Sequence, residues 1–321
     1  MGEAVFISIC IPAYSRVNYL KRLLDSILHQ SYRHFEVVIT DDSPDSAVYD
    51  LVHAHPLRDL VCYFKNDPLL GTPENWNESI RRAKGEWIKL MHDDDWFRDG
   101  ESLEAFVQAI KKSNANFYFS AYDNVFPDGR RMQVKTTAGF IRRLNRNPGI
   151  LLAANRIGPP STVIFRNDPN IIFDKRFRWV VDLDFYMRYL KTHGPAAYIP
   201  KPLVCIGISE TQVTQASFGN RAVEIPERFM LWEKMPAGAW RNLLIYDSWW
   251  RFIRNLKIKR LEEIKESGYP GLIPAFVNSM ILRQNHIRNE LLQSGPFSKA
   301  AMLAHYIIHH AFQKGSLNSN V

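Results

Sequence analysis

The chain has 321 residues, which is enough for one large domain with an appendage or for two modest domains. Its 46% hydrophobic and 23% charged residues are typical of an ordinary soluble globular protein. The net charge of +8 favours anionic partners such as nucleotides, phospholipid head groups or nucleic acid. The alternative is a basic surface kept for solubility.

Cysteine usage and the N-terminus indicate the compartment. Cys10, Cys62 and Cys205 are isolated within apolar runs, which predicts buried thiols in a reducing compartment. The N-terminus lacks the basic region, apolar core and cleavage site of a signal peptide. No apolar run approaches the 18 residues that indicate a membrane span. We therefore expect a cytoplasmic protein, either free or peripheral on the inner face of the cell membrane.

Apolar runs alternate with helical periodicities along the first part of the chain. Residues 6–11 predict a buried strand that stops at Pro12, because proline cannot donate to a ladder. Residues 19–29 then carry leucine and isoleucine at helical spacing. Further strands, separated by helices, are predicted at residues 36–40, 61–64 and 87–91. This alternation predicts an α/β fold in which helices cover a mostly parallel sheet.

The remaining chain predicts mixed elements followed by helices alone. Helices are expected at residues 101–112 and 181–191, and strands at 117–121, 161–166 and 197–208. From about Ala222 onward strand character disappears. We place the boundary after residue 217, which gives a domain at 1–217 and a helical C-terminal region at 218–321.

Three consecutive carboxylates, Asp93, Asp94 and Asp95, follow the predicted strand at residues 87–91. Charge is costly to bury without a partner, so this strand end implies open water or a bound cation. Oxygen ligands favour hard cations such as Mg²⁺ or Mn²⁺, and Mg²⁺ commonly combines one or two carboxylates with a substrate phosphate. Neighbouring side chains alternate on an extended chain, so only one or two of the three should face a metal. The alternative is an acidic loop or a helix N-cap.

The ends of two other strands also carry candidate ligand-binding groups. Pro12 and Ala13 leave backbone groups free to face a ligand, and Tyr14 offers a ring for stacking. Asp41 and Asp42 follow the second strand, where a carboxylate can accept a hydrogen bond from the imide N–H of uracil or thymine. The structural alternatives are a packed turn at the first strand end and an N-cap with a turn at the second. Ligand crevices of such sheets lie at the carboxyl ends of the strands.

Read together, these pieces resemble the nucleotide-sugar-binding half of family 2 glycosyltransferases, which have the Rossmann-like GT-A fold. The resemblance covers roughly residues 5–215 and depends on six short motifs in the right order. They are the strand into Pro12-Ala13-Tyr14, the helix ending in Ser31-Tyr32, residues 35–43, Gly71 with Asn75, residues 83–88, and the acidic cluster. The resemblance implies that the nucleotide is bound by Pro12, Ala13, Tyr14, Arg16, Asp41, Asp42, Gly71, Asn75 and Asp93.

The metal motif of the family is Asp-x-Asp, and this sequence departs from it. Aligned through Trp96-Phe97, the first Asp becomes His92, which leaves Asp94 on the metal and Asp93 near the ribose. A slip of one residue would instead make Asp93 and Asp95 the pair, so Asp94 and Asp95 are both candidate ligands of Mg²⁺ or Mn²⁺. We expect His92 to pack beside the metal rather than bind it, because imidazole suits softer metals.

The family also implies a catalytic base at the start of a later helix, in a Glu-Asp pair followed by a spaced Arg. Residues 181–188 match except that Val181 replaces the Glu, which makes Asp182 the candidate base. Its alternative role is a helix N-cap. Asp184 and Arg188 are spaced for a structural ion pair. Lower-ranked acceptor or diphosphate contacts are Trp179, which could instead fill core, and Gln212 and Thr214 in the loop after the last strand.

Residues 249–261 mix aromatic, aliphatic and basic side chains at helical spacing. This composition suits a helix at an anionic membrane interface, or a packed helix with a solvated basic face. The resemblance as a whole implies an inverting transferase of hexosyltransferase type. It would move a sugar from a UDP or dTDP donor to a saccharide or lipid-linked acceptor in bacterial surface-polysaccharide or glycolipid synthesis. The alternatives are a sugar-phosphate nucleotidyltransferase and a non-enzymatic protein that binds nucleic acid or a lipid surface, although no nucleic acid partner is expected.

Overall fold

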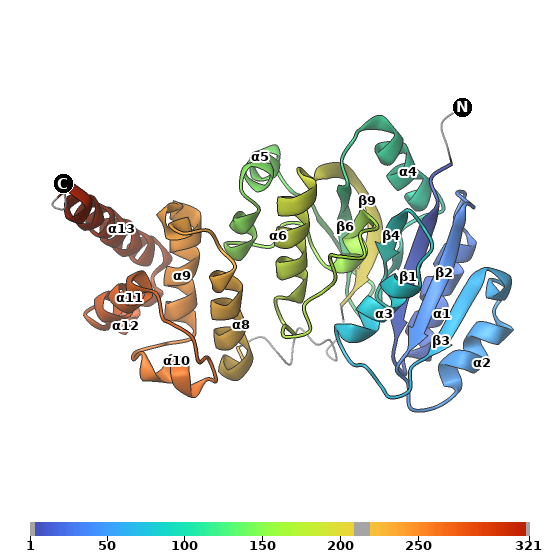
Figure 1. Cartoon of the computed structure of the whole chain (residues 1–321), viewed down its shortest axis with the longest axis horizontal. Coiled ribbons are helices and arrows are strands. Elements are labelled where there is room, and N and C mark those ends of the chain that lie inside the picture. Colours follow the sequence, from blue (N-terminus) through green and yellow to red (C-terminus); the bar gives the residue numbers. More distant parts are fainter. Residues whose placement is uncertain (1–3, 209–218, 319–321) are drawn as a thin grey trace. The chain divides into compact units, whose positions relative to one another are not determined.

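The computed structural model describes residues 4–208 and 219–318. The chain forms two compact units. The first combines Met1–Pro148 with Asn155–Gln212, and the second combines Gly149–Ala154 with Val213–Val321. Figure 1 shows that the first unit holds the sheet and that the second contains the C-terminal helices.

Within the described residues, nine strands form one mixed sheet in the order β3-β2-β1-β4-β8-β6-β9-β5, with β7 paired to β6. The strands that pair in parallel at one end are β1 (Ile7–Ala13), β2 (Phe35–Asp41), β3 (Val61–Lys65) and β4 (Trp87–Leu90). The others are β5 (Trp96–Phe97), β6 (Phe117–Val125), β7 (Arg131–Val134), β8 (Val163–Arg166) and β9 (Ala197–Gly207). β8 is antiparallel to both β4 and β6, whereas β9 is parallel to β6. The predicted α/β fold with a mostly parallel sheet is confirmed.

Helices cover both faces of this sheet because successive side chains of a strand point in opposite directions. Ile7, Ile9 and Ile11 of β1 are fully buried in one hydrophobic cluster. The helices that contribute to this cluster are α1 (Val17–Leu28), α2 (Ala47–Ala54) and α4 (Ser102–Lys112). On the opposite face, Cys10 Sγ donates a 3.4 Å hydrogen bond to the Ser79 carbonyl.

The second face is covered by α3 (Glu74–Arg82) and α6 (Val181–His193). Phe165 of β8 packs against Phe185 and Tyr189 of α6, with ring centroids 5.0 and 5.4 Å apart. Asp182 lies in the first turn of α6, which begins at Val181. It belongs to the same unit as the acidic residues 93–95. The short helix α5 (Ala138–Arg146) lies between β7 and β8 in the chain.

β1 continues through Pro12 to Ala13, so the expectation that the proline ends the strand is wrong. Pairing between β1 and β4 ends at Cys10 and Leu90, whereas pairing with β2 continues to Ala13 and Asp41. Pro12 therefore has a ladder neighbour on one side only, where a missing N–H is tolerated.

The described helices of the second unit begin with α8. They are α8 (Arg221–Glu233), α9 (Leu243–Asn255), α10 (Glu262–Glu266), α11 (Ala275–Asn285), α12 (Asn289–Gln293) and α13 (Gly295–Asn318). The predicted helix at 249–261 ends at Asn255, and its Trp249 and Trp250 are buried. Trp250 Nε1 donates to Ser298 Oγ at 3.1 Å. The two tryptophans thus pack inside the helical unit. No helix among the described residues is long and apolar enough to cross a bilayer.

Candidate active site

The carboxyl ends of β1, β2 and β4 meet at one edge of the sheet. Ala13 lies opposite Asp41 in the parallel register, and the Asp42 N–H donates to the Ala13 carbonyl at 3.0 Å. On the other side of β1, the Met91 N–H donates to the Cys10 carbonyl at 2.9 Å. The two acidic clusters therefore flank the end of β1, in the position where parallel sheets bind ligands.

Arg16 links two of the three consecutive carboxylates. Its Nη2 lies 2.5 Å from Asp93 Oδ1, and its Nη1 lies 2.9 Å from Asp94 Oδ2. The Tyr14 backbone N–H also donates to the Asp93 carboxylate. Burial raises the pKa of Asp93 to about 7, although the Arg16 charge opposes this rise. The structure thus brings together Tyr14, Arg16 and Asp93, which the sequence assigned to the nucleotide.

His92, Asp94 and Asp95 form the candidate metal centre. A ring nitrogen of His92 and one oxygen from each carboxylate all lie within 4.8 Å of one another. The grouping contains both predicted metal ligands. It also contains His92, which we expected to stand beside the metal, and it leaves out Asp93. Burial lowers the pKa of His92 to about 4, and burial together with the Asp94 charge raises the pKa of Asp95.

Hydrogen bonds of Ser161 and Lys89 anchor the acidic loop, residues 92–95. The Ser161 hydroxyl accepts from the backbone N–H of His92 at 3.0 Å and donates to the Asp95 carboxylate. Lys89 is fully buried and donates from Nζ to the Ser161 carbonyl. Burial lowers the pKa of Lys89 to about 7. The Gly207 N–H donates to Asp95 Oδ1 at 3.2 Å, which ties the loop to the end of β9.

These residues fit a divalent cation. Nε2 of His92 is buried and has no hydrogen-bond partner within the described residues. A buried polar atom without a partner is costly, and a bound metal ion would remove that cost. Carboxylate oxygens with an imidazole nitrogen form a donor set suited to a first-row divalent ion.

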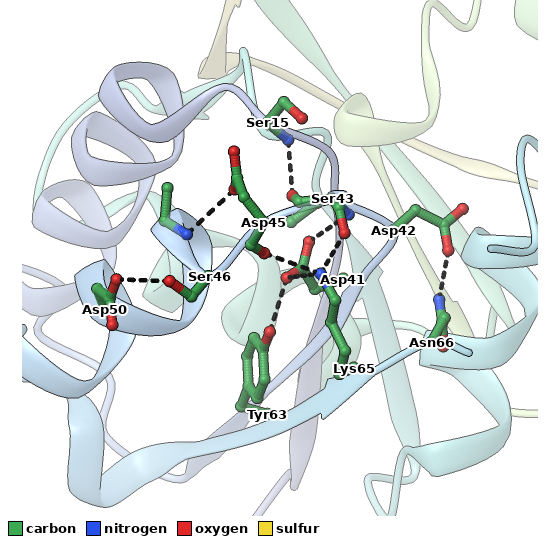
Figure 2. Close-up of polar contacts among 12 residues, drawn as sticks. Ser15, Asp41, Asp42, Ser43, Asp45, Ser46, Asp50, Tyr63, Lys65 and Asn66 are labelled. Carbon is green, nitrogen blue, oxygen red and sulfur yellow. Dashed lines mark hydrogen bonds and ion pairs between the residues drawn. The ribbon is translucent and has the colours of Figure 1, made fainter. Parts of the chain in front are cut away.

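Asp41 is buried at the end of β2, where its carboxylate already has three partners (Figure 2). Oδ1 accepts from the Ser43 N–H at 2.8 Å, and Oδ2 accepts from Tyr63 Oη at 2.6 Å and Lys65 Nζ at 3.1 Å. Burial alone would raise the pKa of Asp41, but these hydrogen bonds outweigh it and lower the pKa. The same Lys65 ammonium donates to the carbonyls of Ser43 and Asp45.

Asp42 organises the loop that follows β3. Its Oδ2 accepts from the Gly71 N–H at 2.7 Å, and its Oδ1 accepts from Asn66 Nδ2 at 2.7 Å. Asn66 Nδ2 also donates to Asn75 Oδ1 at 2.9 Å, and Asn75 Nδ2 donates to the Ala13 carbonyl at 3.3 Å. Four residues predicted to bind nucleotide, Ala13, Asp42, Gly71 and Asn75, thus belong to one hydrogen-bonded network.

The predictions made for the residues at the end of β1 have different outcomes. The Ala13 carbonyl accepts two hydrogen bonds within the fold, so the expectation that Pro12 and Ala13 present free backbone groups is wrong for this atom. The side chain of Ala13 is fully buried. By contrast Tyr14 is 55% exposed, which leaves its ring available for stacking. The structural alternative for the residues after β2 holds in part, because Asp41 closes a turn with the Ser43 N–H, and Asp45 Oδ1 accepts at 3.1 Å from the N–H of Ala47, the first residue of α2.

Asp182 lies in the first turn of α6, one residue inside the helix, so it is not the N-cap. Its Oδ2 accepts from Asn155 Nδ2 at 2.8 Å, and its Oδ1 accepts from the Leu183 N–H at 2.8 Å. Burial raises the pKa of Asp182 to about 6. Burial raises the pKa of the Tyr122 phenol, the Arg156 charge opposes this rise, and the charges of Asp182 and Asp95 add to it.

The remaining predicted residues have mixed outcomes. Arg188 Nη2 lies 2.7 Å from Asp184 Oδ2, which confirms the structural ion pair. Trp179 is half-buried three residues before Asp182. Gln212 and Thr214 lie outside the described residues.

Comparison with known proteins identifies the family. Residues 8–176 of the 321 match Glycosyl transferase family 2. The chain belongs to this family. It is therefore a glycosyltransferase, and its sheet is a GT-A fold.

Two curated relatives illustrate the range of this family. An uncharacterised protein of Mycobacterium tuberculosis is 28% identical over 243 residues, which cover 70% of this chain and 75% of the relative. TuaG of Bacillus subtilis, a glycosyltransferase named for teichuronic acid biosynthesis, is 26% identical over 127 residues. That match covers 38% of this chain and about half, 49%, of TuaG.

Two solved structures share the fold. TarS 1–349 of S. aureus in complex with UDP-GlcNAc superposes with a TM-score of 0.62 at 16% identity, covering 97% of this chain and 92% of TarS. The mannosyltransferase PcManGT of Pyrobaculum calidifontis, in complex with GDP-Man and Mn²⁺, gives a TM-score of 0.54 at 15% identity. The second match covers 94% of this chain and 86% of PcManGT.

Several residues of this family 2 site were missed from the sequence. They hold the predicted carboxylates in place, and they are Tyr63, Lys65, Asn66, Asn155, Ser161 and Gly207. None of these six contacts has a local sequence signal. His92 joins Asp94 and Asp95 because residues 92–95 form a turn, in which the Asp95 N–H donates to the His92 carbonyl at 3.1 Å.

Proposed function

We propose that this family 2 enzyme is an inverting transferase of hexosyltransferase type that uses a nucleotide-diphosphate sugar, with UDP or dTDP as the nucleotide. The observation that supports it best is the placement of two carboxylate sites in one unit. One is the cluster of His92, Asp94 and Asp95 at the strand ends, and the other is Asp182 at the start of α6.

The nucleotide would occupy the strand ends of β1 and β2. The exposed ring of Tyr14 would stack on the base, and Asp93 would face the ribose. Asp42 and Asn75 shape the pocket by fixing the loop around Gly71. The complexes of TarS with UDP-GlcNAc and of PcManGT with GDP-Man support a nucleotide-sugar donor in this fold.

Asp94 and Asp95 would hold Mg²⁺ or Mn²⁺, and the Mn²⁺ complex of PcManGT supports such an ion. When bound, the ion supplies positive charge to the departing diphosphate. Arg16 contacts Asp94 and the neighbouring Asp93 and adds a second positive group at this edge.

Asp182 would act as the general base. Its carboxylate accepts the proton of the acceptor hydroxyl as the hydroxyl oxygen forms a bond to the anomeric carbon. The bond between that carbon and the diphosphate oxygen breaks, and the nucleoside diphosphate leaves with the electron pair. A single displacement of this kind inverts the configuration of the anomeric carbon. Asn155 and the backbone N–H groups of Leu183 and Asp182 donate to this carboxylate, which keeps a lone pair for the acceptor.

The acceptor would be a saccharide or a lipid-linked saccharide of a bacterial surface polymer or glycolipid. The similarity to TuaG, named for teichuronic acid biosynthesis, supports this class.

The test is a screen of nucleotide sugars for metal-dependent hydrolysis or transfer, with the released nucleotide identified. We expect a nucleoside diphosphate and a product of inverted configuration. Release of pyrophosphate would instead indicate a nucleotidyltransferase and would refute the proposal. Asp182→Asn should bind the donor normally and fail to transfer the sugar, while Asp94→Ala should lose metal-dependent binding of UDP. Unimpaired turnover of Asp182→Asn would remove that residue from the mechanism.

A further inference from the structure

His92 occupies an unusual position for a histidine. Its Nε2 is buried and unpartnered within the described residues, and one of its ring nitrogens lies within 4.8 Å of an oxygen of Asp94 and an oxygen of Asp95. Most buried ring nitrogens in proteins find a hydrogen-bond partner, because leaving one unpaired costs about 1–3 kcal/mol. A histidine with an unpartnered buried ring nitrogen beside two carboxylates is a candidate metal ligand.

The surroundings fix the orientation of this ring. The backbone N–H of His92 donates to Ser161 Oγ at 3.0 Å, which fixes the position of the main chain at this residue. The ring packs against Trp76 of α3, with centroids 4.6 Å apart and planes inclined by 42°. A side chain held by packing and a main-chain anchor needs little reorganisation to bind an ion.

The other two members of the cluster have an oxygen to offer. Arg16 contacts Asp94 through Oδ2, which leaves Oδ1 directed elsewhere. Asp95 accepts from the Gly207 N–H through Oδ1 and from the Ser161 hydroxyl, which leaves further lone pairs on its carboxylate. Asp93, in contrast, is engaged by Arg16 and by the Tyr14 N–H and lies outside the cluster. The ligand set is thus one nitrogen and two carboxylates.

We propose that His92 is a metal ligand together with Asp94 and Asp95, and that the nitrogen donor makes this site select Mn²⁺ or a later first-row ion over Mg²⁺. The inference rests on the proposed function, because it assigns the ion that accompanies the donor diphosphate. Mg²⁺ favours oxygen ligands in octahedral geometry, whereas imidazole suits transition ions.

The experiment compares metal binding, without any turnover, by the full chain and four variants, one of which is Asp94→Ala. His92→Gln removes the nitrogen ligand, and His92→Asp replaces it by an oxygen ligand. His55→Gln is the matched control, because His55 is also buried in the first unit but pairs with Asp25 at 3.1 Å. Mn²⁺ and Mg²⁺ are titrated separately by calorimetry. Pulsed electron paramagnetic resonance on the Mn²⁺ complex then detects imidazole ¹⁴N coupling.

The native chain and His55→Gln are expected to show ¹⁴N coupling and the same Mn²⁺ affinity. His92→Gln should lose the coupling and weaken Mn²⁺ binding by about tenfold or more. His92→Asp should lose the coupling and reduce the preference for Mn²⁺ over Mg²⁺ by about tenfold.

Two outcomes would overturn the inference. Mn²⁺ binding by His92→Gln with native affinity, while Asp94→Ala abolishes binding, would remove His92 from the ligand set and leave the proposed function intact. Failure of the native chain to bind either ion, with UDP affinity independent of metal, would remove the metal site from the proposed function as well. Circular dichroism confirms that each variant is folded before the titrations are compared.

Discussion

Asn155 donates a 2.8 Å hydrogen bond from Nδ2 to Oδ2 of Asp182. The amide of Asn155 cannot flip, because its Oδ1 accepts from the N–H groups of Ile157 and Gly158, both at 3.1 Å. The orientation of the proposed base is therefore set by a loop whose own geometry is fixed by main-chain contacts. Asn155 is in this sense a positioning residue.

Replacement of Asn155 by Ala should reduce kcat by about tenfold and leave the KM for the donor unchanged, since the lost contact holds only the base. The hydrogen bond from Asn155 lowers the pKa of Asp182, so its removal should also move the acid limb of the rate profile to higher pH. Steady-state kinetics across pH measure both effects. A merely structural role would lower activity without moving the limb, and that result would contradict the assignment.

The pH dependence of the native enzyme follows from the raised pKa of Asp182. The carboxylate accepts a proton only when ionised, and burial places its pKa at about 6. The rate should therefore rise with pH through about 6 and fall about tenfold per pH unit below that value. Measurement of kcat between pH 4.5 and about 8 tests this. A limb near pH 4, the usual range of an Asp, would indicate that the site is more hydrated than the geometry implies.

Arg16 balances Asp93 and Asp94 when no metal is bound. Arg16→Ala would leave two adjacent, mostly buried carboxylates without their cation. The Arg16 side chain is 36% exposed, so we expect a modest loss of about 1–2 kcal/mol in the free energy of unfolding. Saturating Mn²⁺ should recover most of the loss, because the ion replaces the missing charge.

The measurement is thermal unfolding with and without Mn²⁺. Arg58→Ala is the control, because Arg58 forms only an exposed 3.8 Å pair with Asp59 and should change stability by less than about 0.5 kcal/mol. Equal losses in the two variants would show that Arg16 does not carry the charge balance of the site.

Gly85 allows the acidic strand to lie against β1. A Cβ at this position would stand 2.4 Å from the Ser8 nitrogen and 2.9 Å from the Ile7 carbonyl carbon. Gly85→Ala should therefore cost more than about 2 kcal/mol of unfolding free energy, because β1 and β4 must separate.

Gly139→Ala is the matched control in α5, where the nearest atom, Thr137 Oγ1, is 3.9 Å from the added Cβ. This change should be neutral or stabilise the chain by about 0.5–1 kcal/mol. Urea denaturation of both variants separates steric contact from the general effect of adding a methyl group. Similar midpoints would refute the close-contact argument.

Much of the first unit could be predicted from the sequence. Apolar runs that alternate with helical periodicity lead directly to parallel strands, and carboxylates after two such runs lead to one edge of the sheet. Asp41 and Asp94 were located in this way, and the family resemblance added Asp182. The prediction succeeded where a local pattern and the parallel topology determine the position of a residue.

What the sequence did not reveal depends on contacts between distant residues. Asn155 is 27 positions from Asp182, and Lys65 is 24 positions from Asp41, so neither pairing has a local pattern. The sequence predicted that Pro12 ends the strand, because it does not show that pairing with β4 stops before Pro12. Trp249 and Trp250 suited a membrane equally well until their burial in the helical unit was known.

Ser161 has a practical consequence for anyone who wishes to alter the proposed metal site or the proposed donor site. It contacts Lys89, His92 and Asp95 at once and is fully buried. A mutant library that randomises the acidic loop should therefore keep Ser161 constant, since every variant depends on the same anchor. Tyr14 is exposed, so it is the better starting point for altering the proposed nucleotide-sugar site.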